Sequence, residues 1–124
     1  ERPEEVGFSE PLSELVTLNL TVLKEIIDFN NLFDRYFFLR SNVNCVHPDN
    51  DRQFSEPHID HDFPHFNLLV YLSGDGETIV ENEKHFPQEN DVILFTGNHY
   101  MKRPSKGRRI ILISTIFEYN KKND

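Results

Sequence analysis

The second half of the chain is a series of short apolar segments separated by turn formers, and this pattern limits the fold more than any other feature. Residues 66–72 (FNLLVYL) form the first segment, and the run IILISTIF within 108–117 is typical of a fully buried strand. Turn formers lie between them at 73–76 (SGDG), 87–90 and 104–107. Many short strands joined by turns predict a double-sheet antiparallel jelly roll, with an unrelated β-sandwich as the alternative.

The first half predicts one helix and one long extended segment. Apolar residues recur at helical spacing from residue 11 to about 28, and residues 33–46 are typical of an extended chain. Residues 47–57 (HPDNDRQFSEP) are turn formers and predict a loop. After the SGDG turn, residues 77–80 are expected to form the returning strand of a hairpin.

These segments together predict a mainly β fold, a double-stranded β-helix (jelly roll) with an N-terminal helix packed on it. A chain of 124 residues is long enough for one domain with its own core. We therefore expect a single jelly-roll domain over residues 1–124, with the helix at about 11–28 and the strands at about 33–118.

Composition restricts the class of protein. Eleven phenylalanines and no tryptophan predict a core rich in phenylalanine and aliphatic residues. The single cysteine, Cys45, cannot form an internal disulfide and is expected to be a small buried hydrophobe, which fits a reducing, cytoplasmic location. No apolar run approaches the roughly 20 residues that span a bilayer. The net charge of −8 argues against nucleic acid as a partner, although basic residues gather near the end of the chain and could bind a local anion.

A histidine and an aspartate two residues apart, His58 and Asp60, follow the predicted loop. On an extended segment their side chains point to the same side, because side chains alternate with a period of two. A second histidine from a distant strand, His99, completes a set of two imidazoles and one carboxylate. That set is the facial triad of non-haem Fe(II) oxygenases. The His-x-Asp motif alone is a weak signal, since a solvated polar loop produces it about as often.

The order of motifs over residues 56–117, roughly half the chain, resembles the 2-oxoglutarate- and Fe(II)-dependent dioxygenases, in particular the prolyl-hydroxylase-like group. The shared order is His-x-Asp, a Tyr-Leu strand end, a Gly-Asp-Gly turn, a Pro-x-x-Asn-Asp strand ending in Phe, a distal histidine and Gly-x-Arg. The resemblance implies three iron ligands: His58, Asp60 and His99. It implies two partners for the distal carboxylate of 2-oxoglutarate: Tyr71 and Arg109.

The arginine is chosen on physical grounds as well. Arg108 and Arg109 are consecutive at a strand start, so they face opposite sides of the sheet and only one can enter the interior. The Gly107-x-Arg109 spacing matches the family, and Arg109 then shares a face with Ile111 and Ile113. A guanidinium can bind a carboxylate in bidentate fashion, with a phenol hydroxyl as a second donor. The alternative is a solvated strand end with a tyrosine at the edge of the core.

The position of the distal ligand has two alternatives. His99 follows Phe95 more closely than the family spacing, and an ungapped register places Met101 at the ligand position. A thioether is a poor ligand for hard Fe(II), and the distance along the chain from His99 to Arg109 agrees with the family. We therefore expect His99 to be the ligand. With Met101 in its place, the protein would be a catalytically degenerate jelly-roll binding module.

Three further polar residues lie near the motif. His61 and His65 are expected to be surface histidines of a polar loop, with contacts to metal ligands or substrate as the alternative. Asn67 shares the parity of Leu69 and Tyr71, which would direct it toward the pocket.

The resemblance implies an enzyme that uses Fe(II), 2-oxoglutarate and O2 to hydroxylate an aliphatic carbon, releasing succinate and CO2. It implies no catalytic side chain beyond the metal ligands. The substrate would be an amino acid, a prolyl residue or another small molecule; no membrane partner is expected, and the oligomeric state does not follow. A cupin-type metalloenzyme is the second alternative, although cupins tend to supply a denser histidine cluster and have no need of the late arginine.

Overall fold

The computed structural model describes residues 13–119, with side chains described from residue 20 onward. The elements follow one another as α1 (Ser13–Phe29), β1 (Tyr36–Val46), β2 (Phe66–Ser73), β3 (Thr78–Val80), β4 (Glu83–His85), β5 (Val92–Phe95), β6 (His99–Met101) and β7 (Arg109–Glu118). The predicted helix and the predicted strands that correspond to β2, β3, β5 and β7 are thus confirmed. The strands β4 and β6 were not predicted.

The helix α1 belongs to a first compact unit that ends at Asp34, and all strands belong to a second unit that begins at Arg35. Within α1, Leu23 and Ile27 are one turn apart and fully buried, whereas Val22 and Phe29 are exposed, as an amphipathic helix requires. Among the described residues, no helix is long and apolar enough to cross a membrane. The packing of this helix on the jelly roll stays a prediction.

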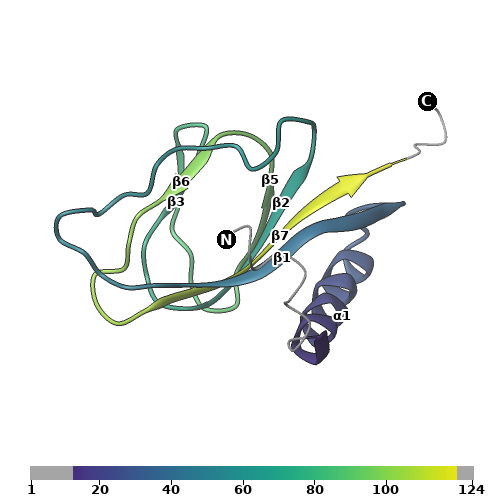
Figure 1. The fold of residues 1–124 in the computed structure, drawn as a ribbon, viewed down its shortest axis with the longest axis horizontal. Helices are drawn as coiled ribbons and strands as arrows, with labels where there is room; N and C mark the ends of the chain where they lie inside the picture. Colours follow the sequence, from purple (N-terminus) through teal and green to yellow (C-terminus); the bar gives the residue numbers. More distant parts are fainter. Residues whose placement is uncertain (1–12, 120–124) are drawn as a thin grey trace, which may run out of the picture. The chain divides into compact units, whose positions relative to one another are not determined.

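The strands form two antiparallel sheets (Figure 1). The larger sheet has the order β1-β7-β2-β5 and the smaller one the order β4-β3-β6. The central strand β7 pairs with β1 on one side and β2 on the other, and its apolar run is buried on both faces. Strands that are adjacent in space but distant in sequence are the mark of a jelly roll, so the predicted fold is confirmed.

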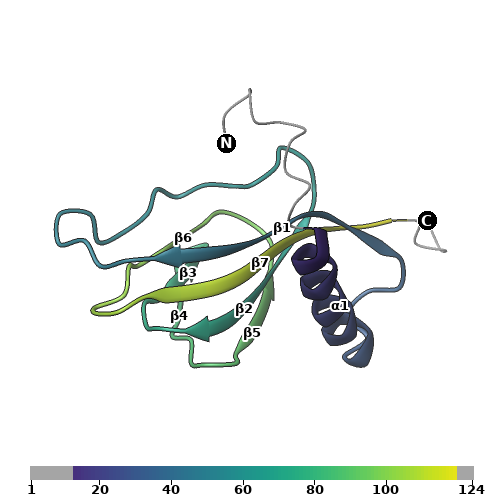
Figure 2. The same ribbon diagram turned by 60° about the horizontal axis from the view of Figure 1, so that its bottom comes forward.

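The segment between β1 and β2 completes the smaller sheet without becoming a regular strand. Residues 47–65 run from the end of β1 to the start of β2 (Figure 2), and two isolated bridges join them to the β6 side: Phe54 with Lys102, and His58 with His99. With this segment beside β6, the smaller sheet has four adjacent chain segments, as many as the larger sheet has strands. The predicted loop at 47–57 is confirmed, apart from the bridge at Phe54. The pairing that forms the site, between His58 and His99, comes directly after this loop.

The core of the strand unit is aliphatic rather than phenylalanine-rich. The buried cluster on the inner face of the larger sheet consists of Leu69, Tyr71 and Ile111, with Ile93, Phe95 and Ile113 packed against it. No phenylalanine is among the buried residues of the described part, and Phe37, Phe54, Phe63 and Phe86 are exposed. The composition-based prediction was therefore right for the aliphatic residues and wrong for phenylalanine, because residue type alone does not say which face of a strand a ring occupies.

The turn after β2 also differs from the prediction. The SGDG segment does not close a hairpin, because β3 pairs with β4 and β6 in the other sheet. The chain crosses from one sheet to the other at this point. Gly74 has φ +91° and approaches the start of β7 so closely that an added Cβ would lie 2.2 Å from the Arg108 carbonyl oxygen. The glycine thereby allows the crossover to pass directly beside Arg109.

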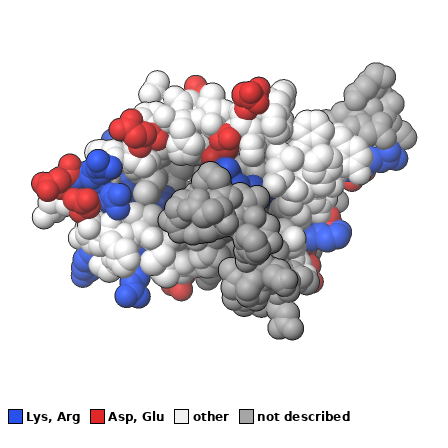
Figure 3. Space-filling view, viewed as in Figure 1, with Lys and Arg blue, Asp and Glu red and all other residues white. Residues whose placement is uncertain are grey.

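Basic and acidic side chains are interspersed where they are visible in Figure 3. That face shows no extended area of basic charge. The expected absence of a nucleic-acid partner stays a prediction.

Candidate metal centre

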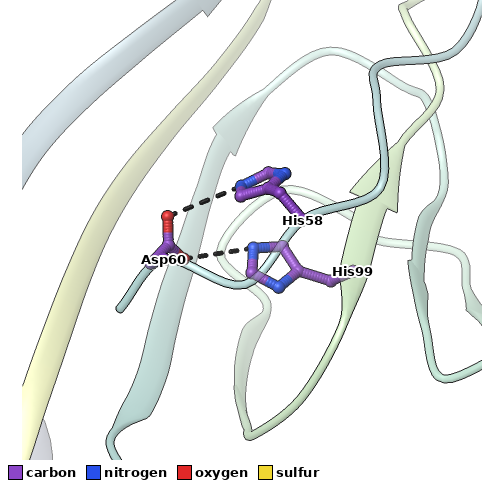
Figure 4. Close-up of side chains that lie close together, drawn as sticks. All are labelled: His58, Asp60 and His99. Carbon is purple, nitrogen blue, oxygen red and sulfur yellow. Dashed lines mark ion pairs between the residues drawn. The ribbon is translucent and has the colours of Figure 1, made fainter. Parts of the chain in front are cut away.

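The structure brings His58, Asp60 and His99 together (Figure 4). Their ligand atoms lie within 4.8 Å of one another. The Nε2 atom of His58 is 3.5 Å from Asp60 Oδ1, and the Nε2 atom of His99 is 3.3 Å from Asp60 Oδ2. Three residues that the sequence placed in one hypothesis are thus close enough in space to share an ion.

Backbone pairing aligns the two histidines. The amide of His58 donates to the carbonyl of His99, and the amide of His99 donates back to His58, each at 3.0 Å. Residues paired in this way across antiparallel chains project their side chains to the same face. The imidazole rings consequently lie 4.5 Å apart between centroids, and both are directed toward Asp60.

Each histidine ring is also fixed by a backbone carbonyl two residues earlier. His58 Nδ1 is 3.0 Å from the carbonyl oxygen of Glu56, and His99 Nδ1 is 3.0 Å from that of Gly97. A carbonyl oxygen only accepts, so in each neutral ring Nδ1 carries the proton and Nε2 keeps its lone pair. This is the arrangement by which metal-binding histidines are usually oriented.

Asp60 receives a hydrogen bond on each carboxylate oxygen. Arg40 Nη2 donates to Oδ1 and Asn67 Nδ2 donates to Oδ2, both at 2.7 Å. When His99 is protonated, its Nε2–H donates to Asp60, and this hydrogen bond lowers the pKa of Asp60 well below its usual value; burial acts against this, and the bond from Asn67 adds to it. The carboxylate is therefore held in its ionised form, as a metal ligand must be.

His99 rather than Met101 lies beside the carboxylate. Burial lowers the pKa of His99, but the hydrogen bond with Asp60 and the contact with the Gly97 carbonyl outweigh it and raise the pKa overall. The Met101 sulfur instead accepts from Arg109 Nη1 at 3.2 Å. The two candidates for the distal position therefore face the same cavity at different points, and the imidazole is the one next to Asp60.

These donors fit a divalent cation of the first transition row. Nitrogen and oxygen ligands about 2.1 Å from such an ion lie about 3.0 to 3.4 Å apart, depending on octahedral or tetrahedral angles. The two distances from Asp60 to the histidines are close to that interval. Two imidazoles and one carboxylate on one side of an ion leave positions open for other molecules.

The triad lies at a cavity of about 190 Å³. The cavity is lined by residues of β1, the segment before β2, and β2, β3, β6 and β7: Arg40, Asn42, Asn44, Ser55, His58, Asp60, Leu69, Thr78, His99, Tyr100, Met101, Arg109 and Ile113. Small carbon skeletons with several polar groups fit a cavity of this size and lining.

Arg109 enters this cavity from β7, as the strand alternation predicts, and is 3% exposed. Its guanidinium donates to the Gly76 carbonyl at 3.3 Å, the Met101 sulfur at 3.2 Å and the Thr78 hydroxyl at 2.7 Å. Burial lowers the pKa of Arg109, partly offset by Tyr71 and Glu77. No described carboxylate forms an ion pair with this buried cation, and the three groups to which it donates are uncharged.

Tyr71 lies beside Arg109 but is not one of the residues that line the cavity. The guanidinium carbon is 5.6 Å from the centre of the Tyr71 ring, and the Tyr71 hydroxyl is 2.5 Å from the Thr78 hydroxyl. Burial raises the pKa of Tyr71, so the phenol stays neutral at physiological pH. Thr78 thus lies between the tyrosine and the arginine, and it is one of the residues that line the cavity.

Several residues near the site differ from their predicted roles. His65 is buried, and the His61 ring is 2.9 Å from the Thr115 hydroxyl, so neither is a simple surface histidine. Asn67 is fully buried against Asp60, in agreement with its parity. Cys45 is exposed rather than buried, because it lies on the outer face of β1.

Thr78 and Arg40 were not among the site residues predicted from the sequence. Thr78 follows the Gly-Asp-Gly segment, which was interpreted only as a turn, so an inward position of the Thr78 side chain was not predicted. Arg40 sits on β1, whose pairing partner β7 lies at the other end of the chain. Knowledge of that pairing would have placed Arg40 opposite Thr115 and therefore on the inner face.

No known protein family matches the chain, and no curated protein matches it. Among solved structures, it is similar to an oxidoreductase of the 2OG-Fe(II) oxygenase family from Burkholderia pseudomallei, with a TM-score of 0.56 and 16% sequence identity. That alignment covers 81% of this chain and 58% of the other, so this chain spans little more than half of that oxidoreductase.

Two further structures are similar at lower scores. A cupin protein from Bacteroides fragilis has a TM-score of 0.49 and 13% identity, covering 71% of this chain and 80% of that one. A predicted oxalate decarboxylase from Thermotoga maritima also has a TM-score of 0.49, with 12% identity and coverages of 66% and 68%. At such identities the oxygenase likeness establishes the jelly-roll fold, and activity has to be argued from the site itself.

Proposed function

We propose that this protein is an Fe(II)- and 2-oxoglutarate-dependent dioxygenase that hydroxylates an aliphatic carbon and releases succinate and CO2. The observation that carries the proposal is the presence, in one cavity, of the His58, Asp60 and His99 set and of a buried guanidinium without a described anionic partner. A metal triad alone suits many hydrolytic and redox enzymes. The addition of a buried arginine favours a co-substrate that both chelates metal and carries a second carboxylate.

The triad, Arg109 and the two residues bound near it then have definite tasks. His58, Asp60 and His99 would hold Fe(II), which supplies the redox chemistry with O2 when bound. Arg109 would bind the distal carboxylate of 2-oxoglutarate, exchanging its weak bond to the Met101 sulfur for a charge-assisted one. Thr78 would donate its hydroxyl to the same carboxylate or keep Arg109 in place. Tyr71 would support this pair through Thr78.

Arg40 and Asn67 keep the carboxylate ligand oriented. They bind different oxygens of Asp60, so the carboxylate plane cannot rotate without breaking one of two 2.7 Å hydrogen bonds. Outer partners of this kind typically change metal affinity by about 10- to 100-fold. The site is therefore supported from β1 and β2 as well as by its own ligands.

Anaerobic titration of the Fe(II)-loaded protein with 2-oxoglutarate tests this proposal. A saturable visible charge-transfer band at about 500 nm is expected when the keto acid chelates the iron. The Arg109→Gln variant should bind Fe(II) like the parent but require far more 2-oxoglutarate to develop the band. Folded, iron-loaded parent protein without any band would contradict the proposal and favour a binding module or a cupin-type metalloenzyme.

A further inference from the structure

The inner face of β1 is polar, whereas the middle of the larger sheet is apolar on that face. The apolar middle consists of Leu69, Tyr71 and Ile111, with Asn67, Thr115 and Arg109 at the ends of the same face. On β1 the same face carries Arg40, Asn42 and Asn44, which pair with Thr115, Ile113 and Ile111 and line the metal cavity.

Meanwhile Val43 of the same strand faces outward and is 49% exposed. Asn42 and Asn44 are exposed as well, so this edge strand is open to solvent on both faces. The polar residues on its cavity side are therefore accessible to a dissolved molecule.

The Arg40 side chain is placed to bind two partners at once. One nitrogen, Nη2, donates to Asp60 Oδ1 at 2.7 Å. Within residues 20–119, Asp60 is the acceptor observed for the Arg40 guanidinium. The side chain remains 47% exposed, although it lines the cavity. A guanidinium has five N–H donors in a planar fork, so donors remain for a second acceptor next to the triad.

The amides of Asn42 and Asn44 extend this row along β1. Residues two apart on a strand project to the same side, so the three side chains form one polar surface across the cavity from the smaller sheet. A carboxamide both donates and accepts. The row therefore offers one fixed positive charge and two groups that can bind hydroxyl, amine or amide functions beside it.

The charges of the cavity residues, the metal and the co-substrate together indicate the charge of the substrate. Its lining holds two arginines, Arg40 and Arg109, and one aspartate, Asp60. A bound divalent cation adds two positive charges, and a 2-oxoglutarate dianion removes two. One positive charge is left, on the β1 side, where the Arg40 side chain is 47% exposed and water screens its charge in part. A substrate with a single negative charge balances it.

We propose that Arg40, Asn42 and Asn44 form the recognition site for the molecule that is oxidised, and that this molecule is a small organic acid with one carboxylate and hydrogen-bonding groups beside it. The statement that this organic acid is the substrate rests on the proposed function. The existence of a second anion site at Arg40, distinct from Arg109, is independent of the reaction and can be tested by binding alone.

The probes are N-acetylglycine and its neutral counterpart N-acetylglycinamide, which have nearly the same shape and differ in one charge. Binding is measured by calorimetry or ligand-observed NMR on the full chain loaded with Zn(II), which prevents turnover, with saturating 2-oxoglutarate present. The carboxylate is expected to bind at least about ten-fold more tightly than the amide, as one charge-assisted hydrogen bond provides. Equal affinity for the two probes would overturn the proposal.

Two variants assign the preference to the β1 row. Arg40→Gln should remove it, whereas Arg108→Gln, which deletes the same charge on the opposite face of the sheet, should leave it intact. Asn42→Asp adds a negative charge to the row while keeping the Arg40 contact with Asp60, and it should abolish or reverse the preference even if Arg40→Gln loses metal. Asn82→Asp in the exposed β3–β4 turn is the matched control. A preference that survives Asn42→Asp contradicts the assignment.

The same titrations separate this proposal from the proposed function. If 2-oxoglutarate fails to bind but the carboxylate preference persists in Arg109→Gln, the second anion site stands and the dioxygenase assignment falls. If 2-oxoglutarate binds through Arg109 but neither probe is preferred, the cofactor assignment stands and the organic-acid substrate is wrong.

Discussion

His58 and His99 exchange two backbone hydrogen bonds of 3.0 Å, and this pairing joins the segment before β2 to β6 at the triad. The metal centre therefore depends on the register of a segment that forms no continuous strand. A shift by one residue would turn His58 and Asp60 to the other side, because side chains alternate along an extended chain.

Asp60→Ala is expected to reduce Fe(II) affinity by more than about 100-fold, since loss of a direct ligand exceeds the cost of losing an outer partner. The change also leaves Arg40 and Asn67 without their acceptor. Anaerobic equilibrium dialysis or calorimetry provides the measurement. Asp62→Ala is the matched control, because this exposed carboxylate two residues away belongs to no metal cluster in the described residues. Parent-like iron binding by Asp60→Ala would show that the site is assigned wrongly.

Arg109→Ala is expected to raise the 2-oxoglutarate requirement by about 100-fold, because truncating one partner of a buried charge pair costs roughly 2–5 kcal/mol. Metal affinity should change by no more than a few-fold, since Arg109 contacts none of the three ligands. Dose–response curves for 2-oxoglutarate, with Arg108→Ala as the control, check this. An equal loss of metal and co-substrate binding would instead indicate general collapse of the cavity.

Thr78→Val is expected to be more disruptive than Tyr71→Phe. The Thr78 hydroxyl contacts both Arg109 Nη2 and the Tyr71 hydroxyl, so its removal leaves two buried polar groups without their partner. We expect a loss of about 1–3 kcal/mol in the free energy of unfolding and a higher 2-oxoglutarate requirement.

Tyr71→Phe removes one side of this contact and leaves Thr78 bound to Arg109, so a loss of about 1 kcal/mol is expected. Urea denaturation and 2-oxoglutarate titration of both variants provide the comparison. A rise in the 2-oxoglutarate requirement that is larger for Tyr71→Phe than for Thr78→Val would indicate direct contact between the phenol and the co-substrate.

Asp75 should make a small pH-dependent contribution to stability. Its carboxylate accepts from the Ser105 amide at 2.9 Å and the Ser105 hydroxyl at 2.7 Å, and these bonds lower its pKa. A folded-state pKa below the unfolded one means that the stabilisation is present above the unfolded value of 3.8 and is lost as pH falls through the folded value.

Ser105→Ala should therefore cost at most about 1 kcal/mol at pH 7, because the site is exposed, and less at pH 3. Urea denaturation at the two pH values measures the difference. A cost that is unchanged or larger at pH 3 would mean that the carboxylate charge has no part in the contact.

Much of the strand unit follows from local pattern. The alternation in 108–117 predicted that only one of Arg108 and Arg109 would enter the interior, and the Gly107-x-Arg109 spacing favoured Arg109; Arg109 is buried while Arg108 is exposed. Likewise the period of two placed His58 and Asp60 on one side, and the structure keeps them together. These predictions succeed because they depend only on neighbours along the chain, where the geometry of an extended backbone leaves one answer.

What the sequence by itself determined is thus the existence of the helix and of the strands other than β4 and β6, the alternation of faces along β7, and the residue types that could hold a metal. Only the tertiary structure decided that β3 leaves β2 for the other sheet, that His99 and not Met101 lies beside Asp60, and that Arg40 and Thr78 belong to the cavity. These features depend on pairing between segments that are far apart in the chain. Such pairing is selected by the burial of the whole sheet rather than by any local pattern, so short motifs could not reveal it.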